Sequence, residues 1–430
     1  MKARKINIIM RLKKISLSKK IFVLCGALGM GTICFTFFIS SEETAPPQVS
    51  TEPAKTTAAL DLTPKPKEVK GIHLSAWIAG AQKARLRIKK LFDETELNAV
   101  VIAVKEYEGE VYIPGVPLVT KYGLYVNAIP DLASYIADYK KRGIYTIARI
   151  VVFKDTNLTK KRPDLAVKKP DGTVWTDHRG FSWSDPYSKQ VWEYNFSIAS
   201  AAIQLGFSEI QFDYIRYPSD GDLKLCRYSF QHHSASSAVN NLNAFIKEAR
   251  ARFKPLGANL SIAVFGLTTS VSTDMGIGQK IVNMTEWADF VSPMVYPSHY
   301  AKGEYGLPDP NSEPYKVVAK SMRDAQKKLG SDSVKLRPYL QDFSLGHKYG
   351  PKEVRAQILA CENSGVTDWL LWDPNCRYTQ TALKSKSGVL DPLAQVPDAM
   401  LDRVKVSSNT AAIPPSTETP TAPELKKSTP

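Results

Sequence analysis

Three acidic residues lie at or directly after the ends of short apolar runs, a place where charged side chains suggest chemistry. Asp213 lies in EIQFDYIRYP, Asp342 follows LRPYLQ and Glu106 follows VVIAVK. Cleavage of a glycosidic bond requires two carboxyl groups, one that protonates the leaving oxygen and one that acts as nucleophile or base. The sequence therefore indicates paired-carboxylate hydrolysis as the first chemistry to consider, provided that the fold brings two of these residues together.

Polar and aromatic residues accompany the three acids near the ends of the apolar runs. Aromatic faces pack against the apolar faces of sugar rings, and guanidinium and amide groups bind hydroxyls. A lone histidine or tryptophan is more often structural, so the prediction rests on how many such residues gather at run ends. The candidate substrate-binding residues are Lys105, Arg149, Trp183, Tyr214, Arg216, Tyr296, His299, Trp372, Asp373 and Asn375.

Other chemistries fit the sequence less well. The six histidines show no HxxxH or HxH spacing and the five cysteines form no CxxC pair, so we expect no metal site. There is no GxSxG nucleophile elbow and no Walker A motif, so we expect neither an esterase nor a nucleotide enzyme, and no cofactor. The sequence leaves open whether Cys361 and Cys376 form a disulfide.

The elements that must position these residues alternate regularly between residues 70 and 406. Short β-branched runs are followed by longer helical patterns, which predicts a (β/α)8 TIM barrel; an open doubly wound sheet is the alternative, but no glycine-rich phosphate loop follows the first run. The predicted strands are 71–77, 98–105, 144–152, 209–215, 260–265, 290–296, 335–341 and 368–372. The predicted helices are 81–97, 129–142, 185–205, 236–253, 315–329 and 351–363, with Ser184 as N-cap of the third and insertions at 106–127 and 219–235.

The fourth predicted strand shows how the barrel would orient the candidate acid. Alternation points Ile210 and Phe212 toward the helices, and Gln211 and Asp213 toward the barrel axis. A carboxylate that points into a barrel mouth is costly unless it is paired or used. We expect Arg216 to pair with Asp213, either in a purely structural ion pair or, together with Tyr214, to hold a catalytic carboxylate.

The amino-terminal region accounts for much of the net charge of +15. Residues 1–20 carry eight basic side chains and no acidic one, and the rest of the chain carries an ordinary +7, so we expect no nucleic-acid partner. Residues 21–39 form an uncharged apolar run that is long enough to span a membrane, and Glu42 and Glu43 follow it. This order predicts a single-pass membrane anchor with the remainder outside the cytoplasm.

A cleaved signal peptide is the alternative to the anchor, and it would make the protein secreted or periplasmic. Residues 41–69 are rich in Pro, Thr, Ala, Glu and Lys and predict a disordered linker, and residues 407–430 predict a disordered tail of similar composition. The folded unit is therefore expected over residues 70–406.

Several of the runs also resemble a known family. EIQFDYIRYPSDG (209–221), FVSPMVYPSHY (290–300), LRPYLQDF (336–343) and WLLWDPNCRY (369–378) are similar to the bacterial DUF4015 family of "putative glycosyl hydrolase" domains, as is DPYSKQVWEYN (185–195). The resemblance covers about residues 70–380 and implies a barrel related to sugar-cleaving enzymes. Two acidic positions of the family pattern are Ala103 and Ala263 here, and an asparagine after the last tryptophan is Asp373.

From these observations we expect a barrel that acts on an unidentified glycan, with Asp213 as the catalytic carboxylate and Asp342 as its partner. Acids that end the fourth and seventh strands match the layout of many retaining glycosidases, although this is an analogy of fold. Glu106 and Asp373 are the other possible partners. Ala103 and Ala263 favour the alternative of a carbohydrate-binding barrel without turnover, and an envelope scaffold is a third hypothesis.

Overall fold

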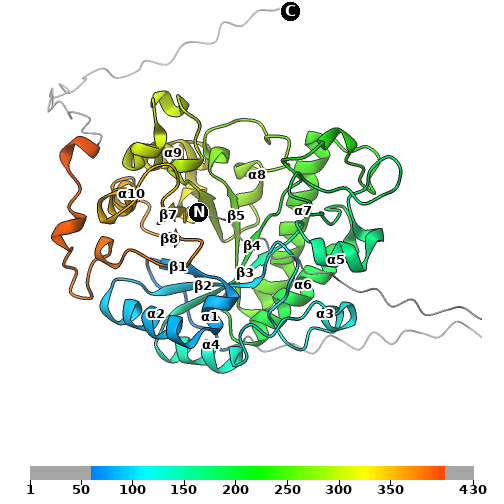
Figure 1. Cartoon of the computed structure of the whole chain (residues 1–430), viewed down its shortest axis with the longest axis horizontal. Coiled ribbons are helices and arrows are strands. Elements are labelled where there is room, and N and C mark those ends of the chain that lie inside the picture. The colour runs from blue at the N-terminus through cyan, green and yellow to red at the C-terminus, as the bar shows by residue number, and fades with distance from the viewer. Residues whose placement is uncertain (1–59, 402–430) are drawn as a thin grey trace, which may run out of the picture. The chain divides into compact units, whose positions relative to one another are not determined.

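Eight parallel strands form a closed barrel in chain order, and helices surround it (Figure 1). This computed structural model describes residues 60–401. The strands are β1 (Lys70–Leu74), β2 (Ala99–Lys105), β3 (Tyr145–Val151), β4 (Glu209–Asp213), β5 (Asn259–Phe265), β6 (Phe290–Met294), β7 (Tyr339–Gln341) and β8 (Trp369–Trp372). The α-helices are α1 (Ala76–Gly80), α2 (Gln82–Glu94), α3 (Pro117–Tyr122), α4 (Leu132–Lys141), α5 (Thr156–Lys161), α6 (Lys189–Gln204), α7 (Ala235–Phe253), α8 (Ile281–Thr285), α9 (Pro314–Leu329) and α10 (Pro351–Asn363). The predicted barrel architecture is confirmed.

The alternation of side chains along β4 follows the prediction. Phe212 packs on the outer side against Phe196 of α6 and Phe245 of α7, with ring centroids 6.3 and 5.1 Å away. Gln211 points inward, where Tyr339 of β7 donates a hydrogen bond to its carbonyl oxygen. Because one face of each strand packs on helices and the other fills the barrel, a period of two fixes which side chains reach the axis.

Several predicted boundaries differ from the structure, and local hydrogen bonds explain most of them. Helix α6 begins at Lys189 with Ser188 as its N-cap, because the Asp185 carboxylate accepts hydrogen bonds from the backbone N–H groups of Tyr187 and Ser229 and holds residues 185–187 in a turn. The predicted N-cap, Ser184, donates instead to the Phe153 carbonyl.

All strands except β5 are shorter than predicted, and β1 and β7 have clear local causes. Strand β1 ends at Leu74, because Ser75 caps the short helix α1 and leaves Trp77 59% exposed. Strand β7 begins only at Tyr339, because Pro338 has no backbone N–H to donate. Helix α10, by contrast, has the predicted bounds 351–363.

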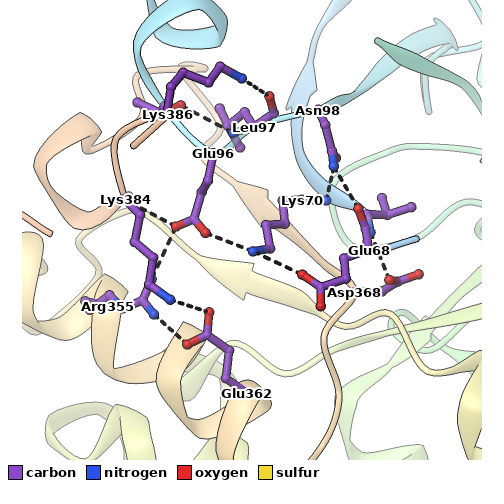
Figure 2. A network of polar contacts seen from close by, with 12 residues as sticks. Glu68, Lys70, Glu96, Leu97, Asn98, Arg355, Glu362, Asp368, Lys384 and Lys386 are labelled. Atoms are coloured by element: carbon purple, nitrogen blue, oxygen red, sulfur yellow. Dashed lines mark hydrogen bonds and ion pairs between the residues drawn. The ribbon is translucent and has the colours of Figure 1, made fainter. Parts of the chain in front are cut away.

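Ion pairs connect the barrel end where the strands begin, as Figure 2 shows. The Glu96 carboxylate accepts from Lys70 Nζ at 3.0 Å, from Arg355 Nη1 at 3.3 Å and from the backbone N–H of Lys384 at 2.9 Å. Asp368 accepts from the backbone N–H of Val69 at 2.8 Å. The chain before β1 and the chain after β8 are thus both attached to the end opposite the carboxyl ends of the strands.

The predicted terminal segments lie largely outside the described residues. The basic segment 1–20, the apolar run 21–39, most of the linker 41–69 and the tail 407–430 are among them, so anchor, signal peptide, linker and tail stay predictions. Within residues 60–401, no helix has the length and apolar character needed to cross a membrane. The described end of the linker packs on the barrel: Val69 is fully buried and Lys65 pairs with Asp368 at 3.0 Å. Cys226, Cys361 and Cys376 carry free thiols in this part of the chain.

Candidate active site

A cavity of about 450 Å³ opens at the carboxyl ends of the strands. Seven of the thirteen predicted site residues line it, namely Arg149, Asp213, Tyr214, Arg216, Tyr296, His299 and Trp372. The other lining residues are Phe265, Gly266, Leu267, Gln279, Met294 and Tyr300. Residues of β3, β4, β5, β6 and β8 contribute to this one space, because parallel strands of a barrel all end on the same face.

Asp213 is held at the base of this cavity by Arg149 of β3. Arg149 Nε and Nη2 donate to Asp213 Oδ2 at 2.9 and 2.7 Å, and both residues are nearly fully buried. The backbone N–H of Tyr214 donates to Oδ1 at 2.7 Å. Both carboxylate oxygens are therefore fixed in direction by hydrogen bonds, which suits a group that must meet a substrate in one orientation.

The predicted pairing of Asp213 with Arg216 is wrong. Tyr214 has a φ of 51°, a left-handed conformation that is rare for a bulky residue, and it turns the chain directly after β4. Arg216 Nη1 consequently donates to the carbonyl of Tyr217 at 3.0 Å and to Ser219 Oγ at 3.1 Å. Arg149, predicted to contact substrate, takes the place beside Asp213.

Glu106 meets Asp213 at the same guanidinium. Arg149 Nη1 donates to Glu106 Oε2 at 3.1 Å, while Nε and Nη2 of the same guanidinium donate to Asp213. Burial raises the pKa of Glu106, and the charge of Arg149 opposes that shift only in part. Glu106 does not line the cavity itself, but 17% of its side chain is exposed. One arginine thus brings two carboxyl groups together at the barrel mouth.

Asp342, the predicted partner of Asp213, forms hydrogen bonds with Thr379. Its two oxygens accept hydrogen bonds from the backbone N–H of Thr379 at 2.8 Å and from the Thr379 hydroxyl at 2.6 Å. Burial raises the pKa of Asp342 to about 7, and the Thr379 bonds oppose this shift. Unlike Glu106, Asp342 makes no contact with Arg149 in the described chain, so the structure does not bring it together with Asp213 and Glu106.

Lys105 lies on the opposite side of the strand from the cavity. The register between β2 and β3 shifts between Ala103 and Lys105, so that Lys105 aligns with the outward-facing Ile150. Such a bulge moves the following side chain to the other face. The ammonium group is fully buried and pairs with Asp155 at 2.8 Å. A direct contact with substrate, as predicted, would require this buried pair to open.

The remaining predicted residues also lie outside the cavity wall. Asp373 Oδ1 accepts from the backbone N–H groups of Asn375 at 2.8 Å and Arg377 at 2.9 Å, and it thereby shapes the loop after β8. Asn375 itself is exposed. Trp183 is buried behind the wall, 4.7 Å from the guanidinium of Arg216.

Aromatic rings form much of the wall. Tyr296 lines the cavity, and its buried hydroxyl has no hydrogen-bond partner within the described residues. Trp372 stacks on His73, with ring centroids 3.9 Å apart, and both nitrogens of this buried histidine likewise lack a partner in that part of the chain. Burial lowers the pKa of both His73 and the more exposed His299. The site therefore presents apolar faces together with unsatisfied polar atoms, a combination typical of ligand sites.

Sequence reasoning missed several residues of the wall. Phe265 and Met294 end β5 and β6, and the rule applied to the other strand ends would have found both. Gln279 offered no such signal, because it lies in a loop and reaches the site through a hydrogen bond that Phe265 N–H donates to its side chain. His73 was overlooked because it precedes the end of β1.

Comparison with known proteins identifies the family. The model of DUF4015, described as "Putative glycosyl hydrolase domain", matches residues 71–378. The chain belongs to this family. A search of curated proteins finds no match.

The structure of a glycoside hydrolase domain supports the fold assignment. The glycoside hydrolase domain of PgaB (BpsB) from Bordetella bronchiseptica is 13% identical, with a TM-score of 0.54 over 72% of this chain and 95% of that one. A hypothetical protein from Ruminiclostridium thermocellum ATCC 27405 is also similar, with 32% sequence identity and a TM-score of 0.41. The match spans 44% of this chain and 96% of that protein. The chain is thus a glycosyl-hydrolase-like barrel of the DUF4015 family.

Proposed function

We propose that this barrel hydrolyses glycosidic bonds of a poly- or oligosaccharide outside the cytoplasm, with Asp213 and Glu106 as its catalytic carboxyl groups. The observation that carries the proposal is the shared contact of both acids with Arg149, which lines an aromatic cavity together with Asp213. Family membership agrees with it, and the uncharged run 21–39 supports a location outside the cytoplasm.

The two carboxyl groups differ in a way that suggests their roles. Burial favours the neutral form of Glu106 and raises its pKa, as a proton donor to the leaving oxygen requires. Asp213 is the ion-paired partner, whose oxygens Arg149 and the backbone of Tyr214 hold in place, and we assign it the role of nucleophile or base. Tyr296 and Trp372 would pack against the sugar ring.

A carbohydrate-binding barrel without turnover is the second candidate. Ala103 and Ala263 are fully buried, and Ala263 faces the interior of the barrel, where the family pattern carries an acidic residue. With fewer carboxyl groups at the mouth, the same aromatic cavity would still bind sugars.

A panel of envelope and storage glycans distinguishes the two candidates. Incubation with the purified protein should release reducing ends from at least one glycan, and Glu106→Gln should lower that rate by about 10²–10⁴-fold while binding persists. The alkaline limb of the pH–rate profile should lie above the ordinary range of a glutamate pKa and disappear in Glu106→Gln. Binding of a glycan by the parent protein with no product from any of them would favour the binding barrel.

A further inference from the structure

Arg216 differs from every other buried cation in the described part of the chain. Six Lys and Arg residues are buried there, and five of them pair with carboxylates. These five are Lys105 with Asp155, Arg149 with Asp213 and Glu106, Lys154 with Asp177, Arg337 with Glu209, and Arg355 with Glu96 and Glu362. Arg216 is only 7% exposed, lines the cavity and forms no ion pair within residues 60–401.

The contacts of Arg216 hold the side chain in place but leave its charge uncompensated. Nη1 donates to the neutral oxygens of Tyr217 and Ser219, and within the described residues the guanidinium makes no other hydrogen bond. Three aromatic rings surround it, with centroids 4.7 to 4.9 Å from its central carbon; they belong to Trp183, Tyr214 and Phe265. Ring faces attract a cation, but they neither neutralise it nor accept hydrogen bonds along its edge.

The nearby acids do not supply the missing partner. Asp213 is bound by Arg149, and Asp177 is bound by Lys154 at 2.8 Å. Asp220 is exposed in the loop that follows and contacts no cation in the described chain. The charged residues that line the cavity are two arginines and one aspartate, so the wall carries a single net positive charge.

We propose that Arg216 binds an anionic substituent, a carboxylate or a sulfate, on the glycan in this cavity. A buried charge is costly without a partner, and the two bonds that Nη1 donates to neutral acceptors could be made by an uncharged amide. A ligand that carries a negative charge explains why a guanidinium occupies this position. Its planar edge fits the two oxygens of a carboxylate or sulfate. This inference rests on the proposed action on glycans and adds the class of glycan.

The test compares matched pairs of glycans by binding to the full-length protein, so that it does not depend on turnover. One pair is oligogalacturonate and its carboxyl-reduced counterpart, and the other is a sulfated carrageenan oligosaccharide, which carries no carboxylate, and its desulfated form. We expect the protein to prefer the acidic member of at least one pair by about tenfold or more, since hydrogen bonds to charged groups contribute that much. The pair that shows the preference identifies the anion.

Substitution of the arginine assigns the preference. Arg216→Gln should reduce the ratio of the affinities for the acidic and the neutral member to about one, and Arg216→Lys should restore part of the preference. Arg323→Gln, on the exposed face of α9, is the control for the change of net charge and should retain the full preference. Equal binding of both members by the unaltered protein, no binding of either acidic glycan, or an unchanged preference in folded Arg216→Gln overturns the proposal.

Rates separate this inference from the proposed hydrolysis. Preferential binding of the acidic glycan with no released reducing ends supports the role of Arg216 and refutes turnover. Cleavage of neutral and acidic forms at equal rates supports turnover and refutes the role of Arg216.

Discussion

The two ends of the barrel differ in how far their polar side chains find partners within the protein. Where the strands begin, Glu96 is shared by Lys70, Arg355 and the backbone of Lys384, and Arg355 also pairs with Glu362 at 2.6 Å (Figure 2). At the carboxyl ends of the strands, the Tyr296 hydroxyl has no partner among the described residues.

This difference between the two ends indicates which of them binds a ligand. Buried polar groups are normally hydrogen-bonded, so a saturated network contributes to stability and a local shortage of partners indicates a missing ligand. At the mouth, Tyr296 and His73 lack hydrogen-bond partners and Arg216 lacks an ion pair within the described residues. At the opposite end Trp369 Nε1 also lacks a partner, but the charged Glu96 accepts from three donors. Substitutions at the two ends should therefore affect different properties of the protein.

The largest expected effect is at the mouth. Asp213→Asn should lower the rate of glycan cleavage by about 10³-fold or more, because a neutral amide can act neither as nucleophile nor as base. Its oxygen can still accept from Arg149. Loss of the Asp213 charge also removes one of the causes that raise the pKa of Glu106, so Glu106 can ionise and become the counterion of Arg149, and the melting temperature should change little. Asp220→Asn, on the exposed loop after β4, is the matched control. Full activity in a folded Asp213→Asn protein would move the catalytic assignment to Glu106, Asp342 and Asp373.

The reverse result is expected at the opposite end. Arg355→Met removes the buried cation that Glu96 and Glu362 share. Both acids are partly buried and still pair with Lys70 and Lys384, so stability should fall by less than the about 3–5 kcal/mol that breaking a fully buried pair commonly costs. Urea denaturation should show this loss, while the rate per folded molecule stays unchanged. Arg323→Met, at an exposed position of α9, should alter stability by less than about 0.5 kcal/mol. A rate defect in folded Arg355→Met would contradict the division of roles between the two ends.

Asp342 is a buried acid outside the cavity wall, and its contribution to stability should depend on pH. Its pKa is raised to about 7, so the folded state binds a proton that the unfolded state has released at lower pH. Its contribution to stability is present below the ordinary aspartate range and is lost as the pH rises through about 7. Asp342→Asn should remove this dependence and stabilise the protein at alkaline pH by at most roughly 4 kcal/mol. Denaturation measured between acid and neutral pH checks it, and an identical pH dependence in the variant would refute it.

Particular residues show how far the sequence could predict this site. The barrel and the inward direction of Asp213 followed from local patterns, because period-two alternation needs no knowledge of distant residues. The outward turn of Lys105 depends on a bulge, and the contact of Asp342 with Thr379 depends on a loop 37 residues away. Neither the bulge nor the contact between loops leaves a periodic signal in the sequence. Arg149 was predicted at the mouth, but its role as the bridge between two acids required the register of β3 against β4.

The smallest effect should come from Tyr296→Phe, which compares an unsatisfied hydroxyl with no hydroxyl at all. The Tyr296 hydroxyl has no partner in the described chain, so its removal should leave the free energy of unfolding unchanged or slightly raised. If this hydroxyl binds a sugar, glycan affinity should fall by about 0.5–1.5 kcal/mol, up to roughly tenfold. Tyr315→Phe on α9 is a useful contrast, because its hydroxyl accepts a hydrogen bond from Asn363 at 3.0 Å away from the cavity, and it should lower stability without changing affinity. A loss of stability in Tyr296→Phe with unchanged glycan affinity would contradict this expectation. It would mean that the Tyr296 hydroxyl makes a hydrogen bond within the protein and that fewer polar groups at the mouth lack partners than the contacts indicate.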